Sequence, residues 1–246
     1  MNKDYFYFKS FYLNQYGASL KICTDSSLYG AWLAEKISLC SNLINGYEIG
    51  TGIGLLSLLI AFKNKQINIK ALDIDAGAIL LAQENKNICF DFSQHIEFIH
   101  KDCCQFNPSN QFDFIFSNPP FYNNEFKSSN TNKNITKHQF NLNYEWLLNH
   151  ISDLLNSSGV GSLLIPDKYF NMVSELINHN DLFLHERVII YDYEQGKAIR
   201  NFLWFSKQQH PSTFINKIII KTSNTNHCTY HQSFKEIMKD FSIKIE

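Results

Sequence analysis

A turn near the middle of the chain carries the groups that would hold a planar amine. It consists of Asn118, Pro119, Pro120 and Phe121, and it follows an aromatic, β-branched run that ends at Ser117. The Asn118 side chain and the Pro119 main chain offer two oxygens for the two hydrogens of an NH2 group. The paired prolines would stiffen this arrangement, and the ring of Phe121 could stack on a flat base. The motif indicates methyl transfer to a weakly nucleophilic nitrogen, with an ordinary strand-ending turn as the alternative.

A second group of candidates is a glycine-rich turn closer to the N-terminus. Glu48 is followed by Gly50, Gly52 and a third glycine at position 54, between a predicted strand and a predicted helix. Glycines permit a tight turn and let a ligand lie against bare backbone. A dinucleotide-binding fingerprint would require a glycine at 55 or 57, where this chain has Leu55 and Ser57. A carboxylate at position 48 would repel a pyrophosphate but suit a cationic ligand, so the turn favours S-adenosylmethionine over a dinucleotide. A glycine-rich turn that binds no ligand is the equally weighted alternative.

Acidic residues follow the second and third predicted strands. Asp73 is expected to accept hydrogen bonds from ribose hydroxyls, whereas Asp75, the competing candidate, better fits the N-cap of the next helix. Asp102 could accept from the adenine amino group, and Ile74 could cover one adenine face. Each acid alone is more often a solvated loop residue or a cap. Because ligands bind at the carboxyl ends of parallel strands, we expect these residues to meet Asn118 at one edge of one sheet.

The elements that must position these residues alternate between strand and helix. Strands are predicted at 43–49, 67–74, 96–100, 112–117 and 161–165, and helices at 55–64, 76–88, 144–155 and 167–178. This alternation is typical of a doubly wound α/β fold with helices on both faces. Two further runs, 182–193 and 198–206, meet near Gly196 and predict an antiparallel hairpin at the sheet edge. We therefore expect a Rossmann-like, mostly parallel sheet of seven strands.

Shorter elements are predicted at both ends of the chain. They are an alternating aromatic run at 5–13, a helix at 26–38 with Asp25 as its N-cap, a strand at 214–221 and a helix at 233–241. We expect a single domain over 1–246. Within it, 1–40 would cap substrate and cofactor, 41–206 would form the catalytic core, and 207–246 would be a C-terminal extension.

The composition is that of a globular α/β protein. The 246 residues, 44% of them hydrophobic, suit one domain with modest additions. The longest apolar run, 55–62, is far too short to span a bilayer, and the N-terminus shows no secretory pattern. The six cysteines form no C-x-x-C pair and no metal spacing with histidine. We expect a cytoplasmic monomer with reduced, mostly buried thiols, no metal and no membrane association.

Charges are distributed unevenly, although the net charge is only −1. Residues 195–235 contain six basic residues and no acid, and residues 126–144 contain Lys127, Lys133 and Lys137 and no acid. Such asymmetry is typical of a surface that faces a polyanion, with chance clustering of solvated lysines as the alternative. The lysines lie in a polar segment, 123–143, whose length, for a loop of a compact domain, is typical of either a functional or a disordered segment.

These features resemble the class I S-adenosylmethionine-dependent methyltransferases. More narrowly, the chain resembles the bacterial tRNA(Val) adenine-N6 methyltransferase family, which modifies adenine 37, 3′ to the anticodon. Many N-methyltransferases share the two turns, whereas the ends are more specific. The matching residues there are Phe8-Lys9, Lys21, Thr24-Asp25, Leu28, Gly30-Ala31-Trp32, Tyr230, Phe234-Lys235-Glu236 and Lys239-Asp240-Phe241. The segment after the turn is usually richer in arginine, which Thr136-Lys137-His138 lacks.

The resemblance implies a role for each group of candidates. The cofactor S-adenosylmethionine would be held by Asp25, Glu48, Gly50, Gly52, Asp73, Ile74, Asp102 and the backbone at Cys103. A flipped adenine of tRNA would be held by Asn118, Pro119, Pro120 and Phe121. Contacts to the RNA would come from Lys127, Lys133, Lys137, His138 and Arg200. Catalysis would consist mainly of positioning and polarisation.

Three other functions use parts of the same pattern. Methyltransferases of adenine or guanine in ribosomal RNA use the same turn. Glutamine N5-methyltransferases of release factors present a side-chain amide to an Asn-Pro-Pro-Tyr turn, but here the aromatic residue is Phe121, and the helical N-terminal domain of those enzymes is absent. A catalytically silent RNA-binding protein would retain the fold, and the intact acids and turn argue against it.

Overall fold

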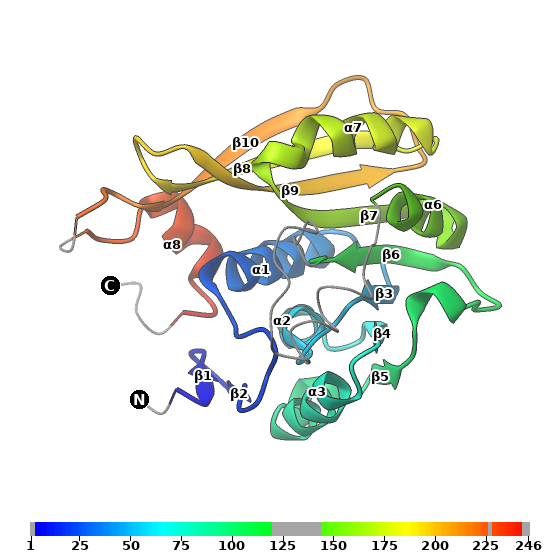
Figure 1. Cartoon of the computed structure of the whole chain (residues 1–246), viewed down its shortest axis with the longest axis horizontal. Coiled ribbons are helices and arrows are strands. Elements are labelled where there is room, and N and C mark those ends of the chain that lie inside the picture. Colours follow the sequence, from blue (N-terminus) through cyan, green and yellow to red (C-terminus); the bar gives the residue numbers. More distant parts are fainter. Residues whose placement is uncertain (1–2, 120–143, 226–227, 243–246) are drawn as a thin grey trace, which may run out of the picture.

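The centre of the computed structural model, which describes residues 3–119, 144–225 and 228–242, is a single large sheet (Figure 1). It has eight strands in the order β10-β8-β9-β7-β6-β3-β4-β5. The strands span Asn45–Ile49 (β3), Asn68–Asp73 (β4), Ile96–His100 (β5), Phe112–Ser117 (β6), Leu155–Pro166 (β7), Phe183–Tyr193 (β8), Ala198–Ser206 (β9) and Phe214–Lys221 (β10). The five strands from β5 to β7 are mutually parallel, and β9 is antiparallel to both neighbours. The doubly wound, mostly parallel fold is confirmed.

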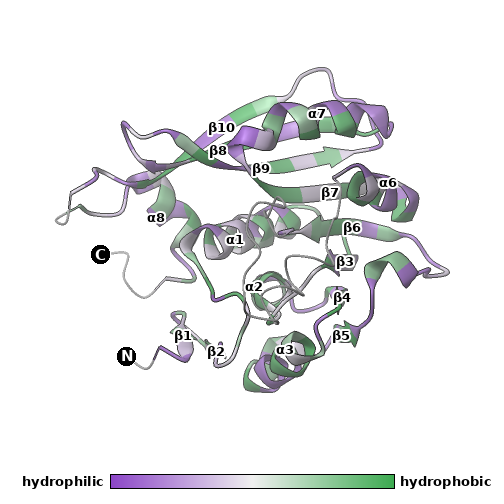
Figure 2. Cartoon of the chain, viewed as in Figure 1, coloured by the Kyte–Doolittle hydropathy of each residue, from purple (hydrophilic) through white to green (hydrophobic). Residues whose placement is uncertain are grey.

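Helices cover both faces of the sheet, and each face has its own hydrophobic core (Figure 1). One core involves α1 (Thr24–Ser38), α2 (Leu55–Lys63), α3 (Ala76–Ile88), α4 (Phe90–Ser93) and α8 (Gln232–Met238). The other involves α6 (Tyr144–Leu154) and α7 (Phe170–His179). Hydrophobic residues run through the strands between these two layers (Figure 2). The central strands are thus buried on both faces, as expected of a parallel sheet.

Helix α2 is enclosed because it is apolar on all sides. Seven of its residues are buried, and five of them are leucine or isoleucine. Helix α1 crosses it closely at Gly30, where an added Cβ would come within 2.5 Å of Leu59 Cδ1. The absence of a side chain at this one position lets the two helices approach each other directly behind the glycine turn.

The N-terminal segment forms a small sheet of its own. Strands β1 (Tyr5–Tyr7) and β2 (Tyr12–Asn14) pair antiparallel, with Phe6 opposite Leu13. These two side chains face the first core, as do Phe8 and Phe11, which stack on each other with ring centroids 4.8 Å apart. The aromatic run predicted at 5–13 is therefore a hairpin that is fastened to the domain by its inner face.

Three expectations about the elements need correction. The sheet has eight strands rather than seven, because β10 pairs parallel with β8. For the same reason the antiparallel hairpin β8–β9 does not lie at the sheet edge. The N-cap of α1 is Cys23 and not Asp25, because the Ser26 hydroxyl, three residues on, accepts the Cys23 amide in a capping box. Asp25 instead lies in the first turn of the helix.

The flanking segments are integrated into the fold. Strand β10 of the expected C-terminal extension joins the main sheet, while α1 and α8 pack on the first core. All six cysteines are free, but only Cys89 and Cys103 are buried, so the expectation of mostly buried thiols is wrong. Within the described part of the chain, no helix combines the length and apolar character needed to cross a membrane.

Candidate active site

One cavity lies at the carboxyl edge of the parallel strands. Its volume is about 360 Å³. It is lined by the glycine turn, the end of β4, the start of α3, residues 16–20 and the end of β6. The sequence predicted that these strand ends would meet, and the cavity brings Gly50, Gly52, Asp73 and Asn118 together. Ile74, Asp102 and Cys103, which were expected at the same site, are not among the residues that line it. Pro119 also lines it, whereas Pro120 and Phe121 lie outside the described residues.

The glycine turn is held open by internal hydrogen bonds. Gly50 and Gly52 have φ angles of 75° and 56°, which L side chains rarely adopt. Leu72 O accepts the amides of Gly50 and Thr51, both at 2.9 Å. Apart from the adjacent residues of the turn, no atom of the described residues lies within 4 Å of a Cβ built on Gly50 or Gly52, so free space adjoins both. A ligand can therefore lie directly on this stretch of backbone.

Asp73 links the glycine turn to β4 while it lines the cavity. Its Oδ2 accepts the Gly52 amide at 2.7 Å, and its Oδ1 accepts the Asp75 amide at 3.0 Å. Burial raises the pKa of the Asp73 carboxyl above its ordinary value. Asp75 caps α3 by accepting the amides of Gly77 and Ala78, so its predicted N-cap role is confirmed. Ile74, half-buried, lies between these two acids.

Glu48 lies beneath the glycine turn rather than in the cavity. It is buried, and its Oε2 accepts hydrogen bonds from the Thr51 and Ser57 hydroxyls. Burial raises the pKa of the Glu48 carboxyl to about 7, although the two hydroxyls oppose this shift. Any electrostatic effect of the Glu48 carboxylate on a ligand in the cavity must therefore act across the glycine turn. Ser57, which excluded a dinucleotide fingerprint, is one of its partners.

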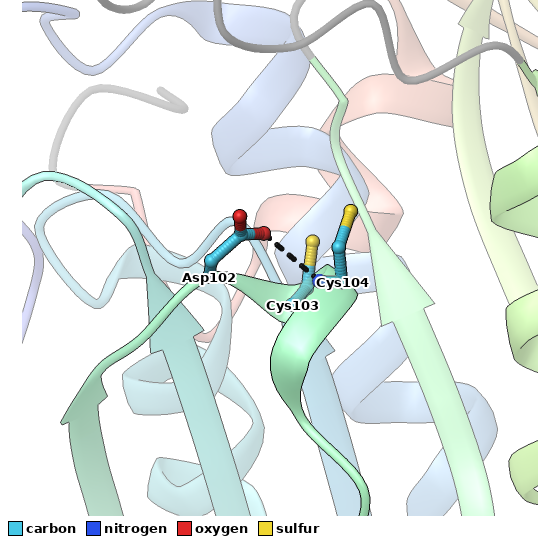
Figure 3. Close-up of side chains that lie close together, drawn as sticks. All are labelled: Asp102, Cys103 and Cys104. Carbon is cyan, nitrogen blue, oxygen red and sulfur yellow. Dashed lines mark hydrogen bonds between the residues drawn. The ribbon is translucent and has the colours of Figure 1, made fainter.

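Asp102 and the adjacent cysteines form a compact group after β5. Asp102 begins the short 3₁₀-helix η1 (Cys103–Gln105), and its Oδ1 accepts the Cys104 amide at 2.9 Å. One carboxylate oxygen and the two sulfur atoms lie within 4.8 Å of one another (Figure 3). Burial raises the pKa of both thiols, that of Cys103 to about 12.

Asn118 provides a buried acceptor that no described group uses. Its Oδ1 is inaccessible to solvent and has no hydrogen-bond partner among the residues that the structure describes. The strand end next to it is fixed, because Ser117 Oγ donates to Ile49 O at 2.7 Å. Ser27 Oγ and Tyr169 OH are also buried and have no partner in the described part of the chain, but neither residue lines the cavity. A buried carbonyl without a donor costs free energy, so the Asn118 oxygen is a candidate acceptor for a hydrogen-bond donor.

Asp25 and Arg200 bind each other instead of lining the cavity. Asp25 Oδ2 and Arg200 Nε are 2.8 Å apart, and both side chains are largely buried. Arg200 lies opposite Pro166 of β7, next to the strand that carries the Asn118 turn. The other predicted RNA contacts, Lys127, Lys133, Lys137 and His138, lie outside the described residues. Asp25 as a cofactor ligand and Arg200 as an RNA contact stay predictions.

Two features of the site were missed in the sequence. Residues 16–20 and the α3 residues Leu80, Leu81 and Glu84 form one wall of the cavity. Asn85, fully buried, bridges this wall to the glycine turn: its Nδ2 donates to Asn14 O and Ile53 O, and its Oδ1 accepts the Asn14 amide. A polar residue on the buried side of the predicted helix 76–88 was the available signal.

Known proteins match this chain in sequence and in fold. A family model described as "Methyltransferase small domain" matches residues 33–143. A tRNA1(Val) (adenine(37)-N6)-methyltransferase of Dyadobacter fermentans is 30% identical over 244 residues, which cover 98% of both chains. A predicted O-methyltransferase from Agrobacterium tumefaciens superposes with a TM-score of 0.64 at 13% identity, covering 88% of this chain and 96% of the other.

A further fold relative was solved with a ligand. Magnesium protoporphyrin IX methyltransferase from Synechocystis, with bound SAM, superposes with a TM-score of 0.55 at 12% identity and covers 75% of this chain and 80% of its own. At such identities the structures show a shared fold, which here is that of methyltransferases. The sequence match extends over both termini and both turns. The chain belongs to the family of tRNA1(Val) (adenine(37)-N6)-methyltransferases.

Proposed function

We propose that this protein methylates the exocyclic N6 of an adenine in tRNA, at position 37 of tRNA(Val). The observation that carries the proposal is the Oδ1 of Asn118, which has no partner among the described residues and belongs to a residue that lines the same cavity as the glycine turn. An amino group is the donor that such an oxygen lacks. Family membership supplies the base and the RNA, because the relatives that match over nearly their whole length carry that activity in their names.

The cavity fits S-adenosylmethionine as the methyl donor. Free space over Gly50 and Gly52 accommodates a ligand against the backbone, and Asp73 lines the same cavity. We infer that Asp73 holds the ribose, that Ile74, Asp102 and the Cys103 amide hold the adenine, and that Asp25 and Glu48 contribute negative charge nearby. Bound there, the cofactor would supply an electrophilic methyl group.

The protein itself holds and orients the acceptor. Asn118 Oδ1 and Pro119 O would accept the two N6 hydrogens, which turns the nitrogen lone pair out of conjugation with the ring. Fixed acceptors in a site of low dielectric constant stabilise the positive charge that develops on this nitrogen. The methylated nitrogen is acidic enough to lose its proton to water. Pro120 would stiffen the turn, and Phe121 would stack on the base.

The RNA must reach the site from the carboxyl edge of the sheet. We propose that Lys127, Lys133, Lys137 and His138 contact its backbone, and that Arg200 does so when it is not engaged by Asp25. Charge-reversal variants of Asp25 and of Arg200 measure directly whether RNA competes with the Asp25–Arg200 ion pair. We further propose that the chain acts as a single-domain monomer in the cytoplasm, where tRNA is modified.

The proposal is tested by identifying the methylated product. The protein is incubated with labelled S-adenosylmethionine and total RNA from a bacterial strain that lacks the activity, and the RNA is digested to nucleosides. We expect labelled N6-methyladenosine in the tRNA fraction. Label confined to ribosomal RNA, or found only on a protein when extract is supplied, would contradict the proposal. If the protein binds the cofactor but transfers no methyl group, the result would favour the alternative of a catalytically silent RNA-binding protein.

A further inference from the structure

Part of the cavity rim is made of apolar side chains that solvent reaches. Tyr16 is 72% exposed, Leu20 52% and Leu80 67%, and all three line the cavity. Tyr16 and Leu20 belong to the short segment between β2 and α1, whereas Leu80 belongs to α3. An exposed leucine gains free energy when a ligand removes its surface from water. The rim therefore offers apolar surface that a ligand in the cavity could cover.

The segment between β2 and α1 is fastened at both of its ends. Gln15 is buried, and its side-chain Oε1 accepts the Ile22 amide at 3.1 Å. Asn14 Oδ1 accepts the Tyr16 amide at 2.9 Å. We call residues 16–21, which lie between these fastenings, the strap. One buried side chain thus closes the base of the strap and fixes where it starts and ends.

The middle of the strap is bound only weakly to the rest of the protein. Within the described part of the chain, its one hydrogen bond beyond its own base runs from Ser19 Oγ to Asp75 Oδ2, at 3.4 Å. Gly17 has a φ of 73°, and a Cβ built on it would meet no atom of the described residues outside the turn within 4 Å. Segments with few buried contacts rearrange at a low cost in free energy. The strap can therefore move inward while its ends stay in place.

Charges on the cavity wall next to the strap favour the cofactor over RNA as the ligand there. Asp73, Asp75 and Glu84 line the cavity, and the described lining residues include no lysine, arginine or histidine. Each carboxylate also accepts a hydrogen bond from the protein, which holds it in place. Carboxylates repel phosphates, but they accept hydrogen bonds from ribose hydroxyls and attract a sulfonium. The volume of about 360 Å³ is also that of a small-molecule site.

We propose that the strap closes over bound S-adenosylmethionine and that Leu20 is the side chain that covers it, which rests on the proposed function. Ser19 already contacts Asp75, two residues after the Asp73 that would hold the ribose. Inward movement of the strap places Leu20 against the ligand and removes water from that side of the cavity. The strap thereby slows release of the cofactor, while the amine that receives the methyl group is left to Asn118.

The first test follows hydrogen exchange in the strap of the wild-type protein. Four strap amides have no acceptor within the described residues, namely those of residues 17, 19, 20 and 21, so they should exchange quickly without a ligand. We expect S-adenosylmethionine to slow their exchange at least about fivefold. An anticodon stem-loop without the cofactor should not. Unchanged exchange with S-adenosylmethionine, or equal slowing by the RNA alone, would overturn the inference.

The second test measures the affinity for S-adenosylmethionine by calorimetry and its dissociation rate by stopped flow. Leu20→Ser should weaken binding about fivefold, mainly through faster dissociation, because it removes apolar surface that closure buries. It should raise the KM for the cofactor more than it lowers kcat. Leu20→Met, which keeps the apolar surface, should bind like the wild type. Leu39→Ser, at a 74% exposed leucine that does not line the cavity, is the matched control.

Each remaining outcome has a defined meaning. Wild-type affinity in Leu20→Ser would overturn the inference, and so would an equal loss in Leu39→Ser or in Leu20→Met. If Leu20→Ser fails to fold, the exchange experiment on the wild type decides alone. If the cofactor slows exchange in the strap but no methyl group reaches tRNA, the proposed function fails and the inference stands. If N6-methyladenosine forms in tRNA while exchange in the strap is unchanged, the inference alone fails.

Discussion

The two sides of the cavity differ in how their polar groups are satisfied. On the cofactor side, the glycine turn binds to Leu72 and Asp73, and Glu48 receives two hydroxyls beneath it. On the acceptor side, the Asn118 oxygen is buried and has no partner within the described residues. On the first side the polar groups are already paired with one another, so a ligand there needs mainly to fit the shape of the cavity. Under the proposed function, a donor group of the substrate would complete the second side, and this requirement would discriminate between acceptors.

The largest effect should come from the incomplete side. Asn118→Ala should lower the rate of methyl transfer by about 10²–10³-fold or more, because one fixed acceptor for the developing charge is lost. Cofactor affinity should change little, and stability should hold, because no described partner loses a bond. Single-turnover transfer to tRNA and calorimetry with S-adenosylmethionine measure the two effects. Asn68→Ala, an exposed amide on β4, is the control, and an active Asn118 variant would refute the assigned role.

On the glycine-turn side of the cavity, Glu48 should make the free energy of unfolding depend on pH. The folded pKa of Glu48 is raised to about 7 from an ordinary value of 4.5. Glu48 therefore favours folding below pH 4.5, and this contribution is lost as the pH rises through 7. Relative to Glu48→Gln, the wild type should lose about 3 kcal/mol of unfolding free energy between these limits. Denaturant titrations from pH 5 to 8 measure it, and parallel curves for both proteins would contradict the assignment.

Asn85 tests whether the scaffold extends beyond the glycine turn. Asn85→Ala should lower the unfolding free energy by about 2–3 kcal/mol, because it leaves the buried Asn14 and Ile53 groups without partners. Cofactor affinity should fall with it, since the turn loses a support. Asn64→Ala, an amide at the end of α2 that binds backbone carbonyls, is a matched control for stability. If stability falls but the affinity for the cofactor does not change, Asn85 supports the N-terminal hairpin and not the glycine turn.

The two acids after β4 allow a narrower comparison. Asp73→Ala should weaken S-adenosylmethionine binding at least about tenfold, because it removes a charged acceptor from the cavity and frees the Gly52 amide. Asp75→Ala should lower stability by about 1 kcal/mol through the lost N-cap, with a smaller effect on affinity. Calorimetry and thermal melting of both variants separate binding from capping. Equal losses of affinity would place the ribose contact on both acids.

The smallest effect should come from the lysine-rich segment. Replacing Lys133 and Lys137 by glutamate should weaken tRNA binding several-fold and flatten its dependence on salt, because fewer counterions are released. Fluorescence anisotropy across a salt series measures both quantities. The same replacement of Lys65, which is exposed near the opposite end of the strands, is the control. An unchanged slope would remove this segment from the RNA footprint.

The sequence predicted most elements and the meeting of the two turns, because strand ends of a parallel sheet share one edge whatever their partners. It could not predict that β10 pairs with β8, since strand pairing is a tertiary choice that a single apolar run does not encode. Nor could it predict that Glu48 points under the turn or that Asp25 meets Arg200. Both facts depend on side-chain contacts between segments far apart in the chain.

Two glycines of this molecule are constrained for opposite reasons. Gly30 lacks room, as an added methyl group would collide with Leu59. Gly52 has ample room, but its left-handed φ opposes any L side chain. The first constraint can be relieved elsewhere, because a shorter residue at 59 would make space for alanine at 30. The second has no remedy at another site, so over evolutionary time position 30 can drift with its neighbour, whereas position 52 cannot.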